Sequence, residues 1–194
     1  MRKFLNVGGA SKQIAVPSQY HGWRHALLDI DPRGAPDVVC DARELRTLPA
    51  GEYDAVYCSH NLEHYYPHDV PKVLAGFCHV LKPDGFAHLL VPDITAVMRA
   101  VVEKNLDIGD ALYQSDAGPI TAHDVLYGLG REIQSSGSDF YAHKTGFTMK
   151  SLLAALGAAG FAPVFLTSGN LEIQALAFRE KPSAYAAALF GLPG

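Results

Sequence analysis

Three aspartates in the first quarter of the chain have the type and spacing to bind a nucleoside. Asp29 follows the glycine pair Gly8-Gly9 by twenty residues, and Asp31 and Asp41 come soon after it. A carboxylate at the end of the second strand of a parallel sheet can accept hydrogen bonds from both ribose hydroxyls. Each acid alone is equally well explained as a helix N-cap or an Asx-turn. Together, beside a glycine turn, they favour a nucleoside site, with Asp29 preferred to Asp31 because it ends the strand.

The glycine pair supplies the second part of this pattern. A short apolar run at residues 4–7 ends in Gly8-Gly9, which indicates a buried strand that opens into a tight turn. Glycine has no Cβ and tolerates positive φ, so the backbone there can approach another group closely. In an open α/β sheet the ligand crevice lies at the carboxyl ends of the strands. We therefore expect Gly8-Gly9 to form the floor of a cofactor pocket.

A histidine-rich segment offers a different chemistry. His60-Asn61-Leu62-Glu63-His64 fits H-x-x-E-H, the pattern in which two histidines bind zinc and the glutamate acts as a base. The segment begins at the end of an expected strand, Pro67 follows shortly, and no third ligand is evident in the sequence. We expect no metal site, and a zinc hydrolase is the alternative that this motif leaves open.

These residues must be positioned by a sheet. Five short apolar runs alternate with helices or turns, a pattern typical of a doubly wound α/β fold with parallel strands. Two further runs are separated by Gly169-Asn170, which suits a type II′ hairpin turn. The sequence thus predicts a mostly parallel, seven-stranded sheet that ends in an antiparallel hairpin. The expected strands are residues 4–7, 25–30, 37–40, 53–58, 86–91, 162–168 and 171–179, and the clearest helices are the later part of 62–81 and 149–159.

Residues 95–148 are too many to be a simple connection between a strand and a helix. They include helix-like stretches at 97–103 and 123–129. An insertion after the fifth strand hangs over the carboxyl ends of the strands, so we interpret it as a substrate lid. A solvated decoration of the surface is the alternative. We expect residues 1–194 to form a single domain that carries this lid.

Composition and charge exclude several classes of protein. The 194 residues are 48% hydrophobic and 19% charged, with a net charge of −4, so nucleic acid is not an expected partner. No apolar run approaches the roughly 20 residues of a membrane span. The apolar run after Met1-Arg2-Lys3 is too short for a signal peptide, so we expect a cytoplasmic protein. Cys40, Cys58 and Cys78 form no C-x-x-C pair and are expected to be reduced, buried thiols.

Several motifs together resemble one family. The chain is similar to class I S-adenosylmethionine-dependent methyltransferases of the small, type-11 kind. The resemblance covers residues 4–93 closely and 149–179 loosely. Its motifs are Leu5-Asn6-Val7-Gly8-Gly9, Leu28-Asp29-Ile30, Asp37-Val38-Val39-Cys40-Asp41, Ser59-His60-Asn61-Leu62-Glu63-His64, Val80-Leu81-Lys82-Pro83-Asp84-Gly85 and Val91-Pro92-Asp93.

The resemblance implies a Rossmann-like methyltransferase fold, the cofactor S-adenosylmethionine and a set of binding residues. Gly8 and Gly9 would lie under the methionine part of the cofactor, Asp29 would hold the ribose hydroxyls, and Ile30 would lie against the adenine. Asp41 and Ala42 would border the adenine, and Ser59 and His60 would line the methyl-transfer side. The cofactor-binding residues expected in this way are Val7, Gly8, Gly9, Asp29, Ile30, Asp41, Ala42, Ser59 and His60.

A proton acceptor is needed only if the methyl acceptor must lose a proton. His60 and His143 are the catalytic candidates; His143 precedes the last long helix, where the resembling family often has a histidine. A surface-loop histidine explains His143 equally well. His64, His123, Tyr113 and Tyr141 are further candidates near the expected pocket.

The expected function is methyl transfer from S-adenosylmethionine to a small-molecule or sugar-like acceptor. Ala10-Ser11-Lys12 stands where the resembling family usually has further glycines, so a catalytically inactive binding or scaffold module is the alternative. A nicotinamide-dependent oxidoreductase is a further hypothesis. The absence of G-x-G-x-x-G and the hairpin expected at the end of the sheet argue against it. The sequence carries no signal for the oligomeric state.

Overall fold

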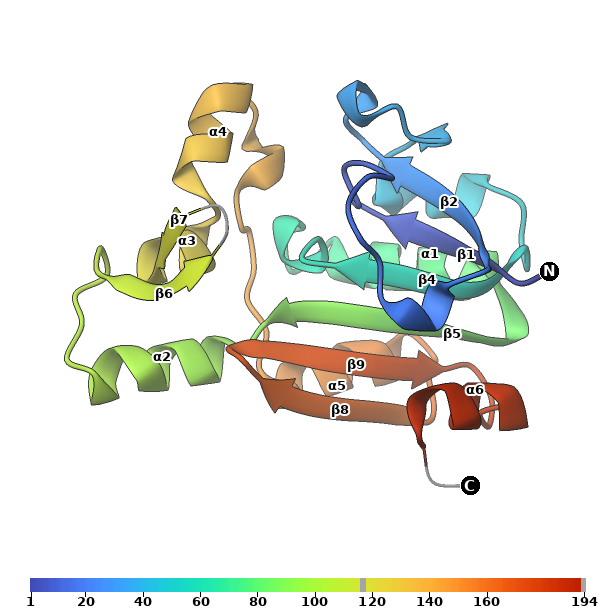
Figure 1. The fold of residues 1–194 in the computed structure, drawn as a ribbon. Coiled ribbons are helices and arrows are strands. Elements are labelled where there is room, and N and C mark those ends of the chain that lie inside the picture. Colours follow the sequence, from blue (N-terminus) through green and yellow to red (C-terminus); the bar gives the residue numbers. More distant parts are fainter. Residues whose placement is uncertain (116–117, 193–194) are drawn as a thin grey trace.

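A twisted sheet of seven strands runs through the centre of the protein (Figure 1). The structure is a computed structural model that describes residues 1–115 and 118–192. The strands lie in the order β3-β2-β1-β4-β5-β9-β8. Their bounds are β1 (Lys3–Val7), β2 (Arg24–Asp29), β3 (Val38–Val39), β4 (Tyr53–Ser59), β5 (Leu81–Pro92), β8 (Val164–Gly169) and β9 (Glu172–Phe178).

The first five strands are parallel, and β9 runs antiparallel to both β5 and β8. This confirms the predicted fold class, a mostly parallel seven-stranded sheet that ends in a hairpin. The strand order reverses at β1, which has β2 on one side and β4 on the other. In open α/β sheets the carboxyl ends of the strands at such a reversal form the ligand crevice.

Each face of the sheet buries its own apolar cluster. On one face, helices α1 (Val70–Val80) and α5 (Met149–Ala158) and the 3₁₀ segment η3 (Ala42–Thr47) cover the larger core. On the other face, Tyr20 and helix α6 (Ala184–Phe190) cover a smaller aromatic core. The Phe190 ring packs on Phe86 of β5 with 5.2 Å between centroids, so the apolar C-terminal tail packs on the chain's own sheet.

Helix α1 shows why the predicted helix after residue 62 forms only in its later part. Leu62–His64 make a short 3₁₀ turn, η4, and α1 begins after it, with Pro71 in the first turn, where its missing N–H is not needed. Buried Val70, Val73, Leu74, Phe77 and Val80 recur at helical spacing and face the sheet.

Two local predictions were wrong. The hairpin turn is formed by Asn170 and Leu171, which both have positive φ (52° and 64°), whereas Gly169 still pairs with Glu172 in the ladder. Positive φ at both central residues is the signature of a type I′ turn rather than type II′. The stretch 82–85, which precedes the strand expected at 86–91, lies within β5, where the register against β4 shifts beside Tyr53.

The described residues between Ile94 and Phe147 fold into a small unit beside the sheet (Figure 1). It contains helix α2 (Ile94–Glu103), the hairpin β6 (Ala111–Ser115) and β7 (Gly118–Thr121), and helices α3 (Ala122–Tyr127) and α4 (Gly130–Ser136). Val97, Leu112, Ile120 and Val125 form its own apolar core. The two ends of the insertion meet, because the Ile94 N–H donates to the Phe147 carbonyl at 3.0 Å.

Two expectations from composition can be compared with the described residues. Within residues 1–115 and 118–192, no helix is long and apolar enough to cross a membrane. Cys40, Cys58 and Cys78 are all free thiols, and Cys58 is fully buried. Burial raises the pKa of the Cys58 thiol, which suits a core residue rather than a nucleophile.

Candidate active site

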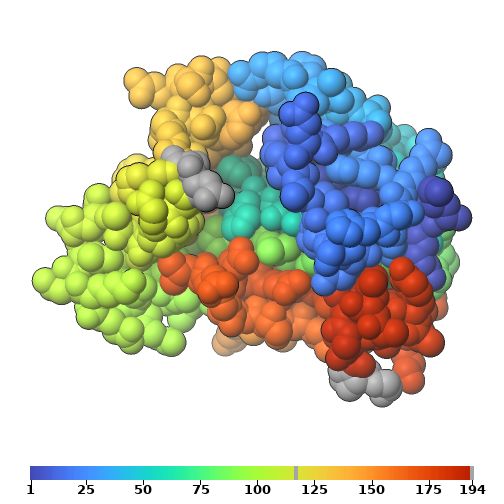
Figure 2. Space-filling view, in the orientation of Figure 1, coloured from blue at the N-terminus to red at the C-terminus, as the bar shows by residue number. Residues whose placement is uncertain are grey.

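A cavity of about 590 Å³ opens at the carboxyl ends of the central strands, at the place where the strand order reverses. Figure 2 shows this hollow between the N-terminal residues in blue and the insertion in yellow and orange. The volume is within the range of small-molecule and cofactor sites, roughly 300–1,000 Å³. The residues around it are Gly8, Ala10, Asp29, Ile30, Asp31, Arg33, Gly34, Asp41, Arg43, His60, Asn61, His64, Tyr65, Tyr66, Asp69, Asp139, Phe140, Tyr141 and Lys144.

Five of the nine expected cofactor-binding residues lie in this wall: Gly8, Asp29, Ile30, Asp41 and His60. The other four, Val7, Gly9, Ala42 and Ser59, are the chain neighbours of wall residues and are outside the wall itself. Val7 and Ala42 are both buried in the main core.

The glycine turn is required by protein side chains. Gly8 has a φ of +70°, and a Cβ at this position would collide with the side chain of Asn61. A Cβ on Gly9 would collide with Asn6. As predicted, other groups closely approach the backbone of the glycine pair, and these groups are asparagine side chains. Asn61 Oδ1 is buried beside the cavity with no hydrogen-bond partner among the described residues, so it can accept a hydrogen bond from a ligand.

Asp29 is at the end of β2, as predicted, and both of its carboxylate oxygens are used. Oδ2 accepts the Ala10 N–H at 2.9 Å, and Oδ1 accepts the Asp31 N–H at 2.9 Å. A carboxylate has about four lone-pair directions, so each oxygen can accept one more hydrogen bond. Asp29 thus fits the hydroxyls of a ribose while it holds the two loops that surround them.

Asp31 and Asp41 each form an ion pair with an arginine two residues later. Arg33 contacts Asp31 at 2.5 Å and lowers the pKa of that carboxyl to about 2. Arg43 contacts Asp41 at 2.6 Å; burial alone would raise the pKa of Asp41, but hydrogen bonds from Arg43 hold it below its ordinary value. Asp41 also caps η3, as its simpler interpretation predicts.

Several residues of the wall, although not the candidate Tyr141, were not expected from the sequence. Arg33 and Arg43 were missed, although Asp-x-Arg occurs at both strand ends and was a usable signal. Phe140 and Tyr141 reach the cavity from the insertion, and the Tyr141 hydroxyl donates to Asp31 Oδ2 at 3.3 Å. The insertion therefore forms one side of the cavity.

His60 follows β4 and adopts a φ of 48°. Its Nε2 forms a hydrogen bond with Glu172 Oε2 at 3.1 Å, and its Nδ1 lies 3.5 Å from Glu63 Oε1. Partial burial alone would lower the pKa of His60, but its carboxylate neighbours raise it to about 10. A histidine with such a pKa keeps its proton at neutral pH, which makes it a hydrogen-bond donor rather than a base.

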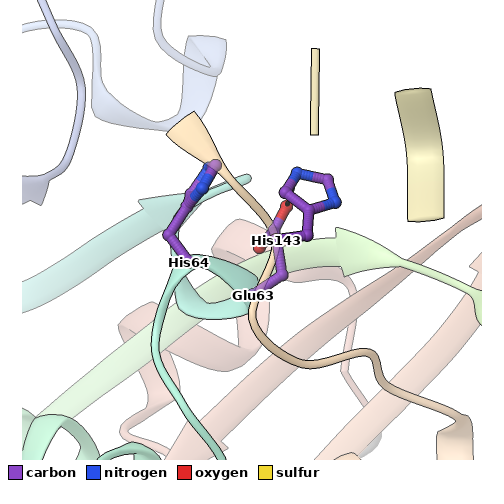
Figure 3. A group of neighbouring side chains, drawn as sticks. All are labelled: Glu63, His64 and His143. Carbon is purple, nitrogen blue, oxygen red and sulfur yellow. Dashed lines mark ion pairs between the residues drawn. The ribbon is translucent and has the colours of Figure 1, made fainter. Parts of the chain in front are cut away.

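The other catalytic candidate, His143, is outside the cavity wall and packs behind His64 (Figure 3). Its Nδ1 bonds to the Val125 carbonyl at 2.8 Å, and its Nε2 lies 4.0 Å from Glu63 Oε1. Burial lowers the pKa of His143, so its Nε2 is an available acceptor at neutral pH. His64 itself lines the cavity.

The H-x-x-E-H segment does not lie on a helix. It spans the end of β4 and the 3₁₀ turn η4, where Glu63 is only 1% exposed. Burial alone would raise the pKa of Glu63, but His60, His64 and His143 hold it below its ordinary value. The fold therefore brings the Glu63 carboxylate close to His143, which is 80 residues later in the sequence.

Known proteins resemble this chain in two ways. A family model described as a methyltransferase domain matches residues 5–89. No curated protein matches the chain. Among solved structures, an S-adenosylmethionine-dependent methyltransferase from Archaeoglobus fulgidus is 17% identical, with a TM-score of 0.57, over 91% of this chain and 85% of that one.

Two further structures share the fold. The PH0226 protein from Pyrococcus horikoshii has a TM-score of 0.61 and 14% identity, over 93% of this chain and 83% of its own. The 1,6-didemethyltoxoflavin-N1-methyltransferase of Burkholderia thailandensis was solved with S-adenosylhomocysteine. It has a TM-score of 0.52 and 19% identity, over 90% of this chain and 69% of its own. The domain match and this shared fold agree with the strand order and the cavity, and the chain is similar in fold to S-adenosylmethionine-dependent methyltransferases.

Proposed function

We propose that the 590 Å³ cavity binds S-adenosylmethionine and that the chain transfers its methyl group to a small-molecule acceptor. The observation that carries this proposal is the position of the cavity, at the strand reversal, with Asp29 in its wall. In this assignment Asp29 holds the ribose hydroxyls and Ile30, which is 37% exposed at the strand end, packs on the adenine. Asp41 borders the base, and Gly8 lies near the methionine part with Val7 and Gly9 supporting it. Ala42 and Ser59 support the wall from behind.

When bound, the cofactor supplies a methyl group on a positively charged sulfur, which a nucleophile on the acceptor displaces. The protein's main task is to align the acceptor with that methyl group. Asn61 and His60 line the cavity after β4 and are suited to orient polar groups there. An acceptor O–H or N–H must also lose a proton, and we propose that His143, behind His64, is the group on that side with a free acceptor nitrogen.

The acceptor is proposed to enter between the sheet and the insertion. Residues 95–148 act as a lid in this proposal, because Phe140 and Tyr141 reach the cavity wall. A small or sugar-like molecule suits the volume that one cofactor leaves. The toxoflavin N1-methyltransferase, which shares the fold, also has a small-molecule substrate, 1,6-didemethyltoxoflavin. A single domain and a cytoplasmic location stay predictions.

Calorimetric titration with S-adenosylhomocysteine tests the cofactor assignment. We expect one molecule bound per chain and at least tenfold weaker binding in Asp29→Ala, because ribose hydroxyls lose their acceptor. Asp84→Ala is the matched control, since Asp84 is exposed and is not in the cavity wall. Equal affinity in a folded Asp29→Ala variant would remove Asp29 from the cofactor site, and tighter binding of NAD would overturn the cofactor itself.

Methyl transfer from labelled S-adenosylmethionine to a panel of small hydroxyl and amine compounds tests the reaction. We expect methyl transfer to one class of compound. A higher KM for that acceptor in Tyr141→Phe would support an acceptor site under the insertion. Cofactor binding with no transfer to any compound would instead favour the alternative that Ala10-Ser11-Lys12 suggests, a binding module without catalysis.

A further inference from the structure

Glu63, His64 and His143 bring three metal-binding groups together at one side of the cavity (Figure 3). One carboxylate oxygen and one nitrogen of each imidazole lie within 4.8 Å of one another. Tetrahedral zinc ligands at 2.0–2.1 Å from the ion are about 3.3 Å apart. Small side-chain rotations therefore suffice to bring the three atoms around one ion.

Glu63 gives an independent reason to look for a cation. Its side chain is 1% exposed, and neither carboxylate oxygen has a hydrogen-bond partner among the described residues. The nearest histidine nitrogens, His60 Nδ1 and His143 Nε2, lie 3.5 and 4.0 Å from Oε1. A buried carboxylate without hydrogen bonds is costly unless a charge or a metal ion compensates it.

One of the two histidines, His143, is oriented as a metal ligand usually is. A metal-binding histidine typically donates its other ring N–H to a backbone carbonyl or a carboxylate, which fixes the ring and its tautomer. His143 Nδ1 lies 2.8 Å from the Val125 carbonyl, so its Nε2 carries the free lone pair that faces Glu63. His64 contacts backbone carbonyls with both ring nitrogens, and a neutral ring can donate to only one of them. The other nitrogen of His64 is therefore unprotonated, and the ring must turn away from a backbone carbonyl for this nitrogen to bind an ion.

We propose that Glu63, His64 and His143 bind a divalent transition-metal ion, with Zn²⁺ as the best match to two imidazoles and one carboxylate. Three protein ligands leave an open position on the ion. His60 lies next to it and is held by Glu172 at 3.1 Å through its Nε2. A proton on His60 is the competing way to neutralise Glu63.

The place of this site gives it a consequence for the acceptor. His60 and His64 line the cavity, so an ion beside them faces its interior. With an ion bound, His143 Nε2 would be a ligand and not a proton acceptor. The ion would bind an oxygen of a hydroxyl compound at its open position and make the proton of that hydroxyl easier to lose. This consequence rests on the proposed function. The acceptor that we infer from it is a hydroxyl compound that can also bind a metal ion. The metal site itself does not rest on the proposed function.

The test is calorimetric titration of the full chain with ZnCl₂ after treatment with EDTA and dialysis, without any cofactor. We expect one Zn²⁺ per chain and at least hundredfold weaker binding in Glu63→Gln and in His143→Gln. His123→Gln is the control, because His123 is an exposed histidine of the same insertion and is outside the cluster. Absence of stoichiometric binding, or equal binding in all variants, would overturn the site.

A second readout guards against variants that fold poorly. Zn²⁺ should raise the Tm of the wild type and of His123→Gln, and leave the Tm of Glu63→Gln unchanged. With Co²⁺, the wild type should show the visible absorption bands of an ion bound by nitrogen and oxygen. Glu63→Gln and His143→Gln should not show these bands. Because S-adenosylhomocysteine can be titrated into metal-free protein, failure of the metal site and failure of the cofactor site are separate results.

Discussion

The carboxylate of Asp29 accepts the backbone N–H of Ala10 across 2.9 Å and so ties the end of β2 to the turn after β1. Its other oxygen accepts the Asp31 N–H, which fixes the loop that leads into β3. A residue expected to bind a ligand thus also makes the turn contact that was its alternative explanation. Loss of affinity and loss of stability in an Asp29 variant must therefore be measured separately.

Asp29→Ala should lower the free energy of unfolding even without ligand. Two backbone N–H groups lose a charged acceptor, and such hydrogen bonds contribute about 1.5–3 kcal/mol each when buried. Because the loops are partly open to water, we expect a total loss of about 2 kcal/mol, measured by urea denaturation. Asp84→Ala should change stability by less than about 0.5 kcal/mol. A stable Asp29→Ala variant would show that the turn holds without this carboxylate.

Gly8→Ala should destabilise the protein by more than about 2 kcal/mol, because it adds both left-handed strain and a collision with Asn61. The double variant Gly8→Ala, Asn61→Ala removes the two closest contacts, with the amide group of Asn61, leaves the Asn61 Cβ at 2.8 Å, and should recover part of the loss. Gly109→Ala is the control, since its Cβ would meet open space. Thermal and urea unfolding measure all four proteins. If the double variant were no better than Gly8→Ala alone, Asn61 would not be the reason for the glycine.

Ala10→Gly should stabilise the chain slightly. Ala10 has a φ of 54°, a conformation that costs a residue with a Cβ about 1–2 kcal/mol and glycine almost nothing. The greater entropy of glycine in the unfolded chain offsets part of this gain, so we expect a net increase of up to about 1 kcal/mol. In the exposed helical control Ala154→Gly the same exchange should cost about 1 kcal/mol. A loss of similar size at both positions would contradict the strain at Ala10.

His88 should make stability depend on pH. It is buried in β5, where the Gln174 amide lies 2.7 Å from Nε2 and the Tyr20 hydroxyl 3.1 Å from Nδ1. Burial lowers the pKa of His88 to about 4, whereas the unfolded chain has a value of about 6.5. The unfolded state therefore takes up a proton first as the pH falls. The contribution of neutral His88 to the unfolding free energy is therefore complete above pH 6.5. It falls by about 3 kcal/mol as the pH decreases to 4.

The variant His88→Gln lacks this titrating group, so its comparison with the wild type isolates the contribution of His88. The difference in unfolding free energy between wild type and variant should shrink by about 3 kcal/mol from pH 7 to pH 4. His21→Gln, a change at an exposed histidine, should leave the pH profile of the wild type in place. A constant difference between wild type and His88→Gln would show that His88 does not titrate in this range.

The sequence was sufficient for features that depend on neighbouring residues. Asp29 could be placed at a strand end because the apolar run before it is continuous, and α1 could be placed because its apolar residues recur at helical spacing. The hairpin between β8 and β9 was predicted, but its turn was not. Leu171 takes a positive φ because its carbonyl accepts the Asp93 N–H at 2.8 Å, a tertiary contact that outweighs local preference.

The candidate site was harder to predict wherever it joins distant segments. His143 and Glu63 meet because the Lys144 N–H donates to the Glu63 carbonyl at 2.8 Å, and no local pattern encodes that contact. The side chain above Gly8 was likewise hidden, since Asn61 reaches it from another strand end. Individual strand ends can be read from the sequence, whereas the contacts between them follow only from the assembled sheet.

The meeting of Ile94 and Phe147 at the base of the insertion has an evolutionary consequence. Because the two ends are hydrogen-bonded to each other, the chain between them leaves and re-enters the sheet at one point. Such a segment can be exchanged for another of different length at a small entropic cost, without changing the order of the strands. Exchange of this segment would change the side of the cavity that Phe140 and Tyr141 form and would leave Asp29 and Asn61 in place.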